Sequence, residues 1–199
     1  MLITPSGACK GQVRPEDMVV VDLETGRPLD PAAKPSSEMR LHAVAYEERP
    51  DANAVLHAHP PLAVAFSLAG VEIAQCLLPE VLIGLGAIET TEYATPTTQA
   101  AAEAIRHLVR TCDAIVLDRH GSVTVGVTLE AAYFNLERLE WAARVTHAAR
   151  QLGSCRSLPK DEVERLLEVR AKLTGRARPA PCNLCGACIG GERLLAIPS

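Results

Sequence analysis

The stretch that decides the fold is residues 54–60, which read Ala-Val-Leu-His-Ala-His-Pro. An apolar run that leads into His57 and His59 is typical of a β-strand, in which residues i and i+2 point to the same face. We therefore expect the two imidazoles side by side. Pro60 has no N–H for a ladder and is expected to end the strand. Neutral imidazole is a common metal ligand, so the pair indicates either part of a metal site or two half-buried histidines with local hydrogen bonds.

Strand and helix patterns alternate irregularly around this stretch. A hairpin is predicted over 114–127, and a strictly parallel sheet would instead need a crossover helix between each pair of strands. The sequence also lacks a GxGxxG pattern after its first strand. These observations favour a mostly antiparallel or mixed sheet flanked by helices over a doubly wound fold. The predicted strands are 1–3, 17–23, 52–59, 114–117 and 122–127, with weaker strand candidates at 71–78, 80–85 and 86–93, and the predicted helices are 38–49, 62–69, 98–111, 129–153 and 161–173.

Composition narrows the functional class. The chain has 199 residues, 48% of them hydrophobic, which is enough for one sizeable core. The net charge of −4, without a basic stripe, makes nucleic acid an unlikely partner. The N-terminus does not read as a signal peptide, and the apolar runs are far shorter than a membrane span, so we expect a cytoplasmic protein that does not enter a membrane. The number of cysteines, seven, is odd, and four of them are scattered without framework spacing, which agrees with that compartment; these four are Cys9, Cys76, Cys112 and Cys155.

A third histidine and two hydroxyl-rich turns complete the candidate site. His120 follows a buried strand and precedes Gly121, so its side chain is expected at a sheet edge where the backbone turns sharply. Together, the three histidines could bind a metal with one open position. Residues 35–38 (Pro-Ser-Ser-Glu) at a helix start could bind an anion and place a carboxylate beside it, or they could be a helix-capping pattern. Residues 4–7 (Thr-Pro-Ser-Gly) could add donors or form an ordinary turn.

In this order, the pieces resemble the class II aldolase/adducin family, most closely its L-fuculose-1-phosphate aldolase branch. The resemblance implies a three-layer α/β/α fold with a mostly antiparallel central sheet. It also implies a homotetramer with active sites at subunit interfaces. The matching stretches are 2–7, 34–38, 49–55, 57–59, 93–96 and His120-Gly121.

The resemblance assigns a role to each matching position. One Zn²⁺ per subunit would be bound by His57, His59 and His120, and Glu38 would be the catalytic acid/base. The implied reaction cleaves a ketose 1-phosphate to dihydroxyacetone phosphate and an aldehyde. The alternatives are a sugar-phosphate epimerase or dehydratase of the same family, or a non-catalytic interaction domain like the adducin branch. The phosphate of the sugar substrate would be bound by Ser6, Gly7, Ser36 and Ser37.

Two features depart from the family pattern. The family normally has a helix and a hairpin before the segment matched by residues 2–7, with an Asn that helps to hold the phosphate. This sequence begins at Met1, so the expectation is a start assigned late or a shortened member that lacks this donor. The tyrosine that the aldolase branch supplies near residues 76–79 is not evident either. The acid on the aldehyde side is therefore unassigned, with Tyr93 and Tyr133 as speculative choices.

The C-terminal region is expected to be separate from the family-like part. We predict an aldolase-like domain over residues 1–155, followed by a C-terminal helix and a cysteine-containing tail over residues 156–199. Cys182, Cys185 and Cys188 have CxxCxxC spacing, which can hold a second, thiolate-bound metal or can belong to a tail with free thiols.

Overall fold

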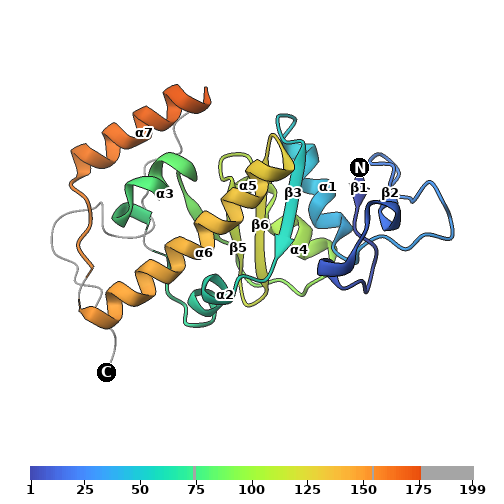
Figure 1. Cartoon of the computed structure of the whole chain (residues 1–199), viewed down its shortest axis with the longest axis horizontal. Coiled ribbons are helices and arrows are strands. Elements are labelled where there is room, and N and C mark those ends of the chain that lie inside the picture. The colour runs from blue at the N-terminus through green and yellow to red at the C-terminus, as the bar shows by residue number, and fades with distance from the viewer. Residues whose placement is uncertain (74, 154, 176–199) are drawn as a thin grey trace.

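The computed structural model of this chain describes residues 1–73, 75–153 and 155–175. Within these ranges, the centre of the molecule is a four-stranded sheet in the order β3-β6-β5-β4 (Figure 1). The predicted hairpin is confirmed, because β5 and β6 pair antiparallel and Leu117 lies opposite Gly121. The strand that contains His57, β3, pairs antiparallel with the other side of β6. The strand bounds are β3 (Ala54–Ala58), β4 (Ile88–Thr90), β5 (Ala114–Leu117) and β6 (Gly121–Gly126).

The central sheet is mixed, and the prediction of a mostly antiparallel sheet was wrong. β4 runs parallel to β5. Parallel neighbours require a crossover connection, and here the chain crosses through two short helices, α4 (Gln99–Ala104) and α5 (Arg106–Val109). The sequence pattern predicts a helical segment between the two strands, but it does not predict that β4 forms the edge strand beside β5.

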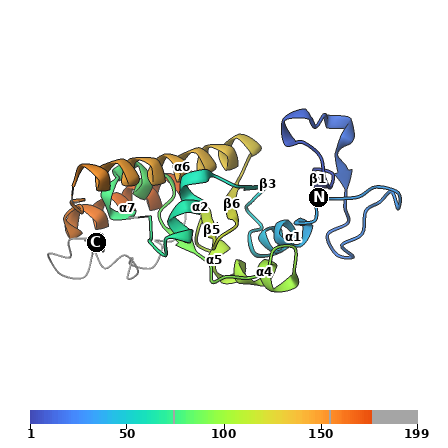
Figure 2. The ribbon, with the colours of Figure 1, turned by 90° about the horizontal axis from the view of Figure 1, so that it is seen from below.

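Helices cover both faces of the sheet, which confirms the α/β class. On one face lie α1 (Met39–Glu48), α4 and α5, and on the other lie α2 (Pro61–Leu68), α3 (Pro79–Gly84) and α6 (Leu129–Leu152) (Figures 1 and 2). The strand alternation explains both layers. Ile115 packs into the cluster with α1, α4 and α5, whereas its neighbours Ala114 and Val116 pack into the cluster with α2, α3 and α6.

The N-terminal residues form a small sheet of their own beside α1 (Figure 2). The strands predicted at 1–3 and 17–23 are present but short, as β1 (Leu2–Ile3) and β2 (Val19–Val20), which pair antiparallel. Ile3, Val19 and Val21 form a separate buried cluster, against which Met39 of α1 packs. This contact places the N-terminal turns next to the start of α1. Two 3-10 turns, Lys10–Gln12 and Pro15–Asp17, lie between the strands.

Two local predictions differ from the structure. Residues 80–85 were a strand candidate, but Pro79–Gly84 is helix α3, with Val81 and Leu82 buried. A short apolar run cannot be assigned to strand or buried helix from periodicity alone, although Pro79 at the first helical position favours a helix. The helix predicted to run to about residue 111 is broken at Ile105. The Thr98 hydroxyl caps its first part by accepting a hydrogen bond from the Ala101 N–H. A 3-10 turn at Gln75–Leu77 precedes α3.

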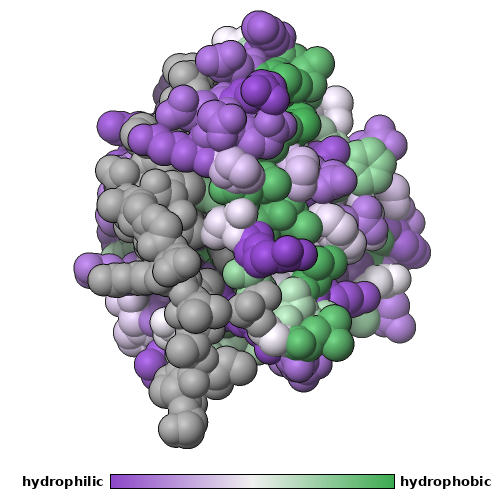
Figure 3. Space-filling view, turned by 90° about the vertical axis from the view of Figure 1, so that its left-hand side faces the viewer, coloured by the Kyte–Doolittle hydropathy of each residue, from purple (hydrophilic) through white to green (hydrophobic). Residues whose placement is uncertain are grey.

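The helix predicted at 161–173 is confirmed as α7 (Lys160–Thr174), and it packs onto α3 through Val163 and Leu167, a contact that the sequence did not predict. Hydrophobic side chains form a band down this side of the molecule, with hydrophilic residues beside it (Figure 3). No helix in the described ranges is both long enough and apolar enough to span a membrane. Cys182, Cys185 and Cys188 lie outside the described residues, so the thiolate-bound metal stays a prediction.

A buried ion-pair network also fastens α7 to the core. Asp113, just before β5, accepts hydrogen bonds from Arg49 at the end of α1 and from Arg170 of α7, and all three side chains are less than a tenth exposed. Arg49 also donates to the carbonyl groups of Val109 and Cys112. The network therefore joins segments from three parts of the sequence.

We expect Asp113→Ala to lower the free energy of unfolding by about 3 kcal/mol, because it leaves two buried guanidinium groups without their shared carboxylate. Urea unfolding followed by circular dichroism measures this change. Glu137→Ala, which removes an exposed carboxylate on α6, is the control and should change stability by less than about 0.5 kcal/mol. Equal effects of the two substitutions would contradict the structural role of the network.

Candidate metal centre and surrounding site

Three histidines meet at one end of the central sheet. His57 lies in β3, His59 follows that strand, and His120 lies in the turn between β5 and β6. One nitrogen from each imidazole lies within 4.8 Å of the others. The ring centroids are 5.0 Å apart for His57 and His59, 4.8 Å for His57 and His120, and 5.1 Å for His59 and His120. Residues separated by sixty positions thus form one cluster because β3 and the hairpin turn meet at the same end of β6.

His57 is oriented for a ligand. Its Nδ1 lies 3.0 Å from the backbone carbonyl oxygen of Ser122. A carbonyl oxygen only accepts hydrogen bonds, so Nδ1 carries the proton and Nε2 presents a lone pair. Nε2 is buried and has no hydrogen-bond partner among the described residues. Burial lowers the pKa of His57 from 6.5 to about 4, so the ring is neutral at neutral pH.

The unpartnered Nε2 of His57 shows whether these residues could bind a metal. A metal-bound histidine typically donates its other N–H to a carbonyl or carboxylate, as His57 does here. Three imidazoles also match the protein ligands of catalytic zinc sites that keep one position open. The described residues therefore fit a zinc ion held by His57, His59 and His120.

Glu38 lies beside the three histidines, at the N-cap position of α1. Its side chain is buried, at 9% exposure, and its backbone N–H donates to the Ser36 hydroxyl. Burial lowers the pKa of His120, and the nearby negative charge of Glu38 opposes that shift. A carboxylate next to three imidazoles can either complete a metal shell or move a proton.

The two hydroxyl-rich turns are paired with each other. Pro5 and Pro35 form an antiparallel bridge, and the backbone N–H of Ser6 donates to Lys34 O at 2.9 Å. The Ser36 N–H in turn donates to Thr4 O at 3.0 Å. The pairing links the first turn to the segment that leads into Glu38. The chain thereby places the 4–7 turn next to the 35–38 turn, although thirty residues separate them.

The first turn also lines a cavity of about 470 Å³ together with residues that the sequence analysis did not use. Gly7, at φ 71°, adopts a left-handed conformation that most side chains avoid. The lining residues are Pro5, Ser6, Gly7, Ala8, Cys9, Gln12, Val13 and Asp17.

Gly121 is the tightest position of the cluster. A Cβ atom at this residue would lie 2.5 Å from Ala58 O, 2.6 Å from a ring carbon of His59 and 3.2 Å from a ring carbon of His57. Real Cβ atoms do not approach other heavy atoms this closely, so the histidines could not keep their positions beside any larger residue. Sequence reasoning recognised that Gly121 turns the backbone, but the contact with β3 is visible only once the strands are paired.

A cavity of about 680 Å³, which was not expected from the sequence, lies beside His59. The outward face of α6 forms most of its wall. The alternation of aromatic and charged residues on α6 was a signal for this surface, but the same pattern is found on ordinary exposed helices. The lining residues are Ala58, His59, Pro60, Tyr133, Leu136, Glu137, Arg138, Glu140, Trp141 and Arg144.

The other three histidines are not part of the cluster, although His42 in α1 is near enough to His57 to help lower its pKa. His107 and His147 are exposed, whereas His42 in α1 is largely enclosed and its pKa is lowered by burial to about 4. None of the three belongs to the metal-ligand group found among the described residues.

Comparison with known proteins identifies one family, whose matching members include proteins named as aldolases and one named as a decarboxylase. Residues 1–147 match the family model described as the Class II Aldolase and Adducin N-terminal domain. The chain is 36% identical to a 5-methylthioribulose-1-phosphate/5-deoxyribulose-1-phosphate aldolase of Rhodospirillum rubrum, over 84% of this chain and 75% of that protein. It is 36% identical to an L-fuculose phosphate aldolase of Methanococcus vannielii, over 73% and 77%. A solved L-fuculose 1-phosphate aldolase superposes with a TM-score of 0.74 at 27% identity, over 84% and 78%.

We expect Gly121→Ala to weaken zinc binding by at least about tenfold, because the new methyl group displaces His59 and His57. Competition with a chromogenic chelator measures the affinity. Gly11→Ala is the matched control, since a Cβ there meets nothing within 4 Å. Zinc binding of normal strength by the Gly121 variant would contradict the described packing of the cluster.

A second prediction concerns pH. The folded pKa of His42 is about 4 against an ordinary value of 6.5. Below pH 6.5 the unfolded chain takes up a proton that folded His42 refuses, so stability falls as the pH drops from 6.5 towards 4. Above pH 6.5 both states are neutral and His42 has no such effect.

His42→Gln should therefore flatten the loss of stability between pH 6.5 and 5, measured by urea unfolding in the presence of a chelator. The exposed His107 provides the control, and His107→Gln should leave the wild-type profile unchanged. A His42→Gln profile as steep as that of the wild type would show that His42 is not kept neutral by burial.

Proposed function

The chain belongs to the class II aldolase and adducin family, and because its relatives include named aldolases, we propose that it is a zinc-dependent aldolase acting on a ketose 1-phosphate. The products would be dihydroxyacetone phosphate and an aldehyde. The single observation that carries the proposal is the cluster of three imidazoles beside a buried carboxylate.

The chemistry follows from the groups present. When bound, zinc supplies a Lewis acid that polarises the carbonyl group of the substrate. Glu38 moves the proton: in cleavage it delivers a proton to the carbon that loses its bond to the aldehyde, and in the reverse direction it removes that proton. Its position next to His120 supports this assignment, because the carboxylate lies at the edge of the ligand cluster.

The phosphate would be bound by Ser6, Gly7, Ser36 and Ser37. The pairing of the 4–7 and 35–38 turns supports this part of the proposal, since it brings the hydroxyl of Ser6 and the backbone of Gly7 next to the serine-containing turn that precedes Glu38. For the aldehyde side, Tyr133 lines the cavity next to His59 and Tyr93 does not, which favours Tyr133 as the acid.

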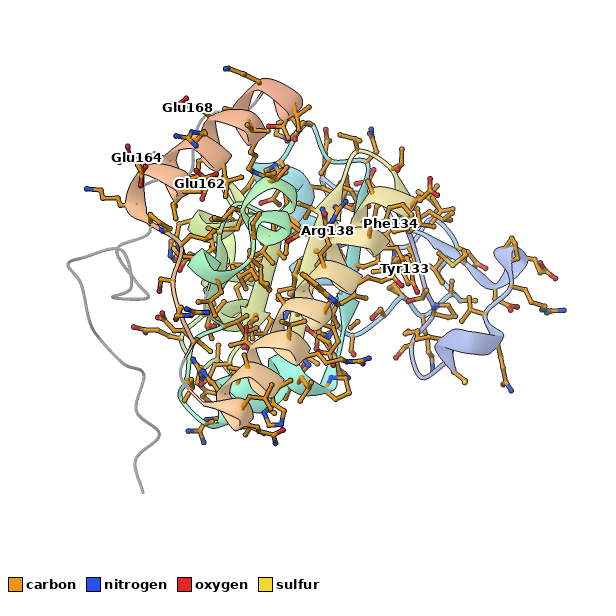
Figure 4. The ribbon with its side chains drawn as sticks, turned by 60° about the vertical axis from the view of Figure 1, so that its left-hand side comes forward. Tyr133, Phe134, Arg138, Glu162, Glu164 and Glu168 are labelled. Carbon is orange, nitrogen blue, oxygen red and sulfur yellow. The ribbon has the colours of Figure 1, made fainter. Side chains whose placement is uncertain are left out.

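The oligomer that we propose is a homotetramer in the cytoplasm. The outward face of α6 supports self-association, because Tyr133 and Phe134, labelled in Figure 4, are 47% and 42% exposed there. Trp141, on the same helix, is also 42% exposed. Large aromatic side chains are enriched at protein interfaces. We further propose that residues 1–155 form the aldolase domain and that residues 156–199 are an addition to it.

The other candidate functions predict different outcomes. An epimerase or dehydratase of the same family would use the same metal cluster, so analysis of the products separates these activities from an aldolase. An adducin-like interaction domain needs no metal ligands, and the arrangement of His57, His59 and His120 argues against it.

The test is cleavage by the zinc-loaded chain of L-fuculose 1-phosphate and 5-deoxyribulose 1-phosphate, with dihydroxyacetone phosphate measured by a coupled assay. Glu38→Gln should bind zinc normally and lose at least about a hundredfold in kcat, because it cannot move the proton. His57→Ala should lose the metal. Glu130→Gln, an exposed carboxylate on α6, is the control and should retain activity. A zinc-loaded wild type that releases no dihydroxyacetone phosphate from any ketose 1-phosphate would overturn the proposal.

A further inference from the structure

The short helix α2 lies between two of the three histidines. Its N-terminus follows His59 directly, with Pro60 in the cap position. Its last turn reaches the loop between β5 and β6 that carries His120, through Ser67. In Figure 1, α2 lies beside this end of the sheet and below α6. Any change in the tilt of α2 would therefore alter the separation of His59 and His120.

In the turn that carries His120, each backbone N–H of residues 118–120 donates a hydrogen bond. The Asp118 N–H donates to the Thr91 hydroxyl at 3.2 Å, and the His120 N–H donates to Leu117 O at 3.1 Å. Between them, the Arg119 N–H donates to the Ser67 hydroxyl at 2.9 Å. Of these three N–H groups, only that of Arg119 is held by a side chain of α2.

Arg119 needs such an anchor. Its φ of 57° is in the left-handed region, which costs a residue other than glycine about 1 kcal/mol or more. A conformation of this kind persists only where its surroundings enforce it. Ser67 is 7% exposed, and its hydroxyl also donates to Val64 O, so the acceptor is fixed in direction. The Ser67 hydroxyl therefore supports the backbone conformation immediately before His120.

The other end of α2 is anchored from α6. The carboxylate of Glu140 accepts hydrogen bonds from the backbone N–H groups of Leu62 and Ala63, at 3.1 to 3.2 Å. A carboxylate at a helix N-terminus satisfies free N–H groups and interacts favourably with the helix dipole. Since Leu62 is three residues beyond His59, Glu140 fixes the point at which the chain leaves the cluster.

We propose that Ser67 and Glu140 are positioning residues for the metal centre. α2 acts as a rigid spacer between His59 and His120, Glu140 holds its first turn, and Ser67 holds the turn that precedes His120. The proposal rests on the zinc site of the proposed function, but it does not depend on which substrate is cleaved. Neither residue binds the metal in this account.

The experiment measures the zinc affinity of the full chain by chelator competition. Ser67→Ala should weaken zinc binding by about tenfold, as other supports of metal ligands do. Ser67→Thr keeps the hydroxyl and should retain wild-type affinity. The matched control is Thr146→Val, which removes a buried hydroxyl that has no hydrogen-bond partner among the described residues. It should leave zinc affinity unchanged.

Glu140→Ala provides the second arm and should also lower zinc affinity, whereas Glu140→Gln retains one acceptor oxygen and should fall between wild type and alanine. Thermal unfolding of the zinc-free variants identifies any loss of affinity caused by misfolding. Wild-type affinity in both Ser67→Ala and Glu140→Ala would overturn the inference. If the wild type binds zinc but cleaves no ketose 1-phosphate, the proposed function is overturned, whereas the zinc affinities of the variants still support the positioning roles. If the wild type binds no zinc, both proposals are overturned.

Discussion

The site depends on one close contact, between the backbone of Gly121 and the end of β3. The absence of a side chain at Gly121 lets the hairpin turn approach Ala58 O and the rings of His59 and His57. The antiparallel pairing of β3 with β6 fixes the register at which this happens, with Ala58 opposite Ser122. The same register places Ser122 O where it accepts the proton of His57 Nδ1. Strand pairing, ring orientation and ligand spacing thus follow from a single geometric constraint.

The rest of the fold supports that contact from several directions. The N-terminal sheet packs on Met39, which brings the 4–7 turn against the segment before Glu38. On the opposite face, α2 joins His59 to the turn before His120. The buried pairing of Asp113 with Arg49 and Arg170 lies at the other end of β5 and fastens α7, so it stabilises the scaffold without entering the site. Stability and chemistry are therefore largely carried by different ends of the sheet.

The sequence predicted much of the site but less of its support. The alternation in β3 and the position of His120 after a buried strand were local patterns, and both the hairpin and the three-histidine cluster follow from such patterns. The parallel pairing of β4, the helical state of residues 80–85 and the roles of Ser67 and Glu140 depend on contacts between distant segments. Serine and glutamate at positions 67 and 140 look like ordinary helix residues in the sequence, because only the folded chain shows what their oxygens bind.

The central claim is that His57, His59 and His120 hold one zinc ion, with His57 bound through its orphaned Nε2. A crystal structure of the zinc-loaded chain, with anomalous data on both sides of the zinc edge, tests it most directly. The account predicts a zinc peak about 2.1 Å from Nε2 of His57 and from one nitrogen of each of the other two rings. A zinc-loaded crystal with its peak elsewhere, or with His57 bound through Nδ1 after losing the contact to Ser122 O, would contradict it.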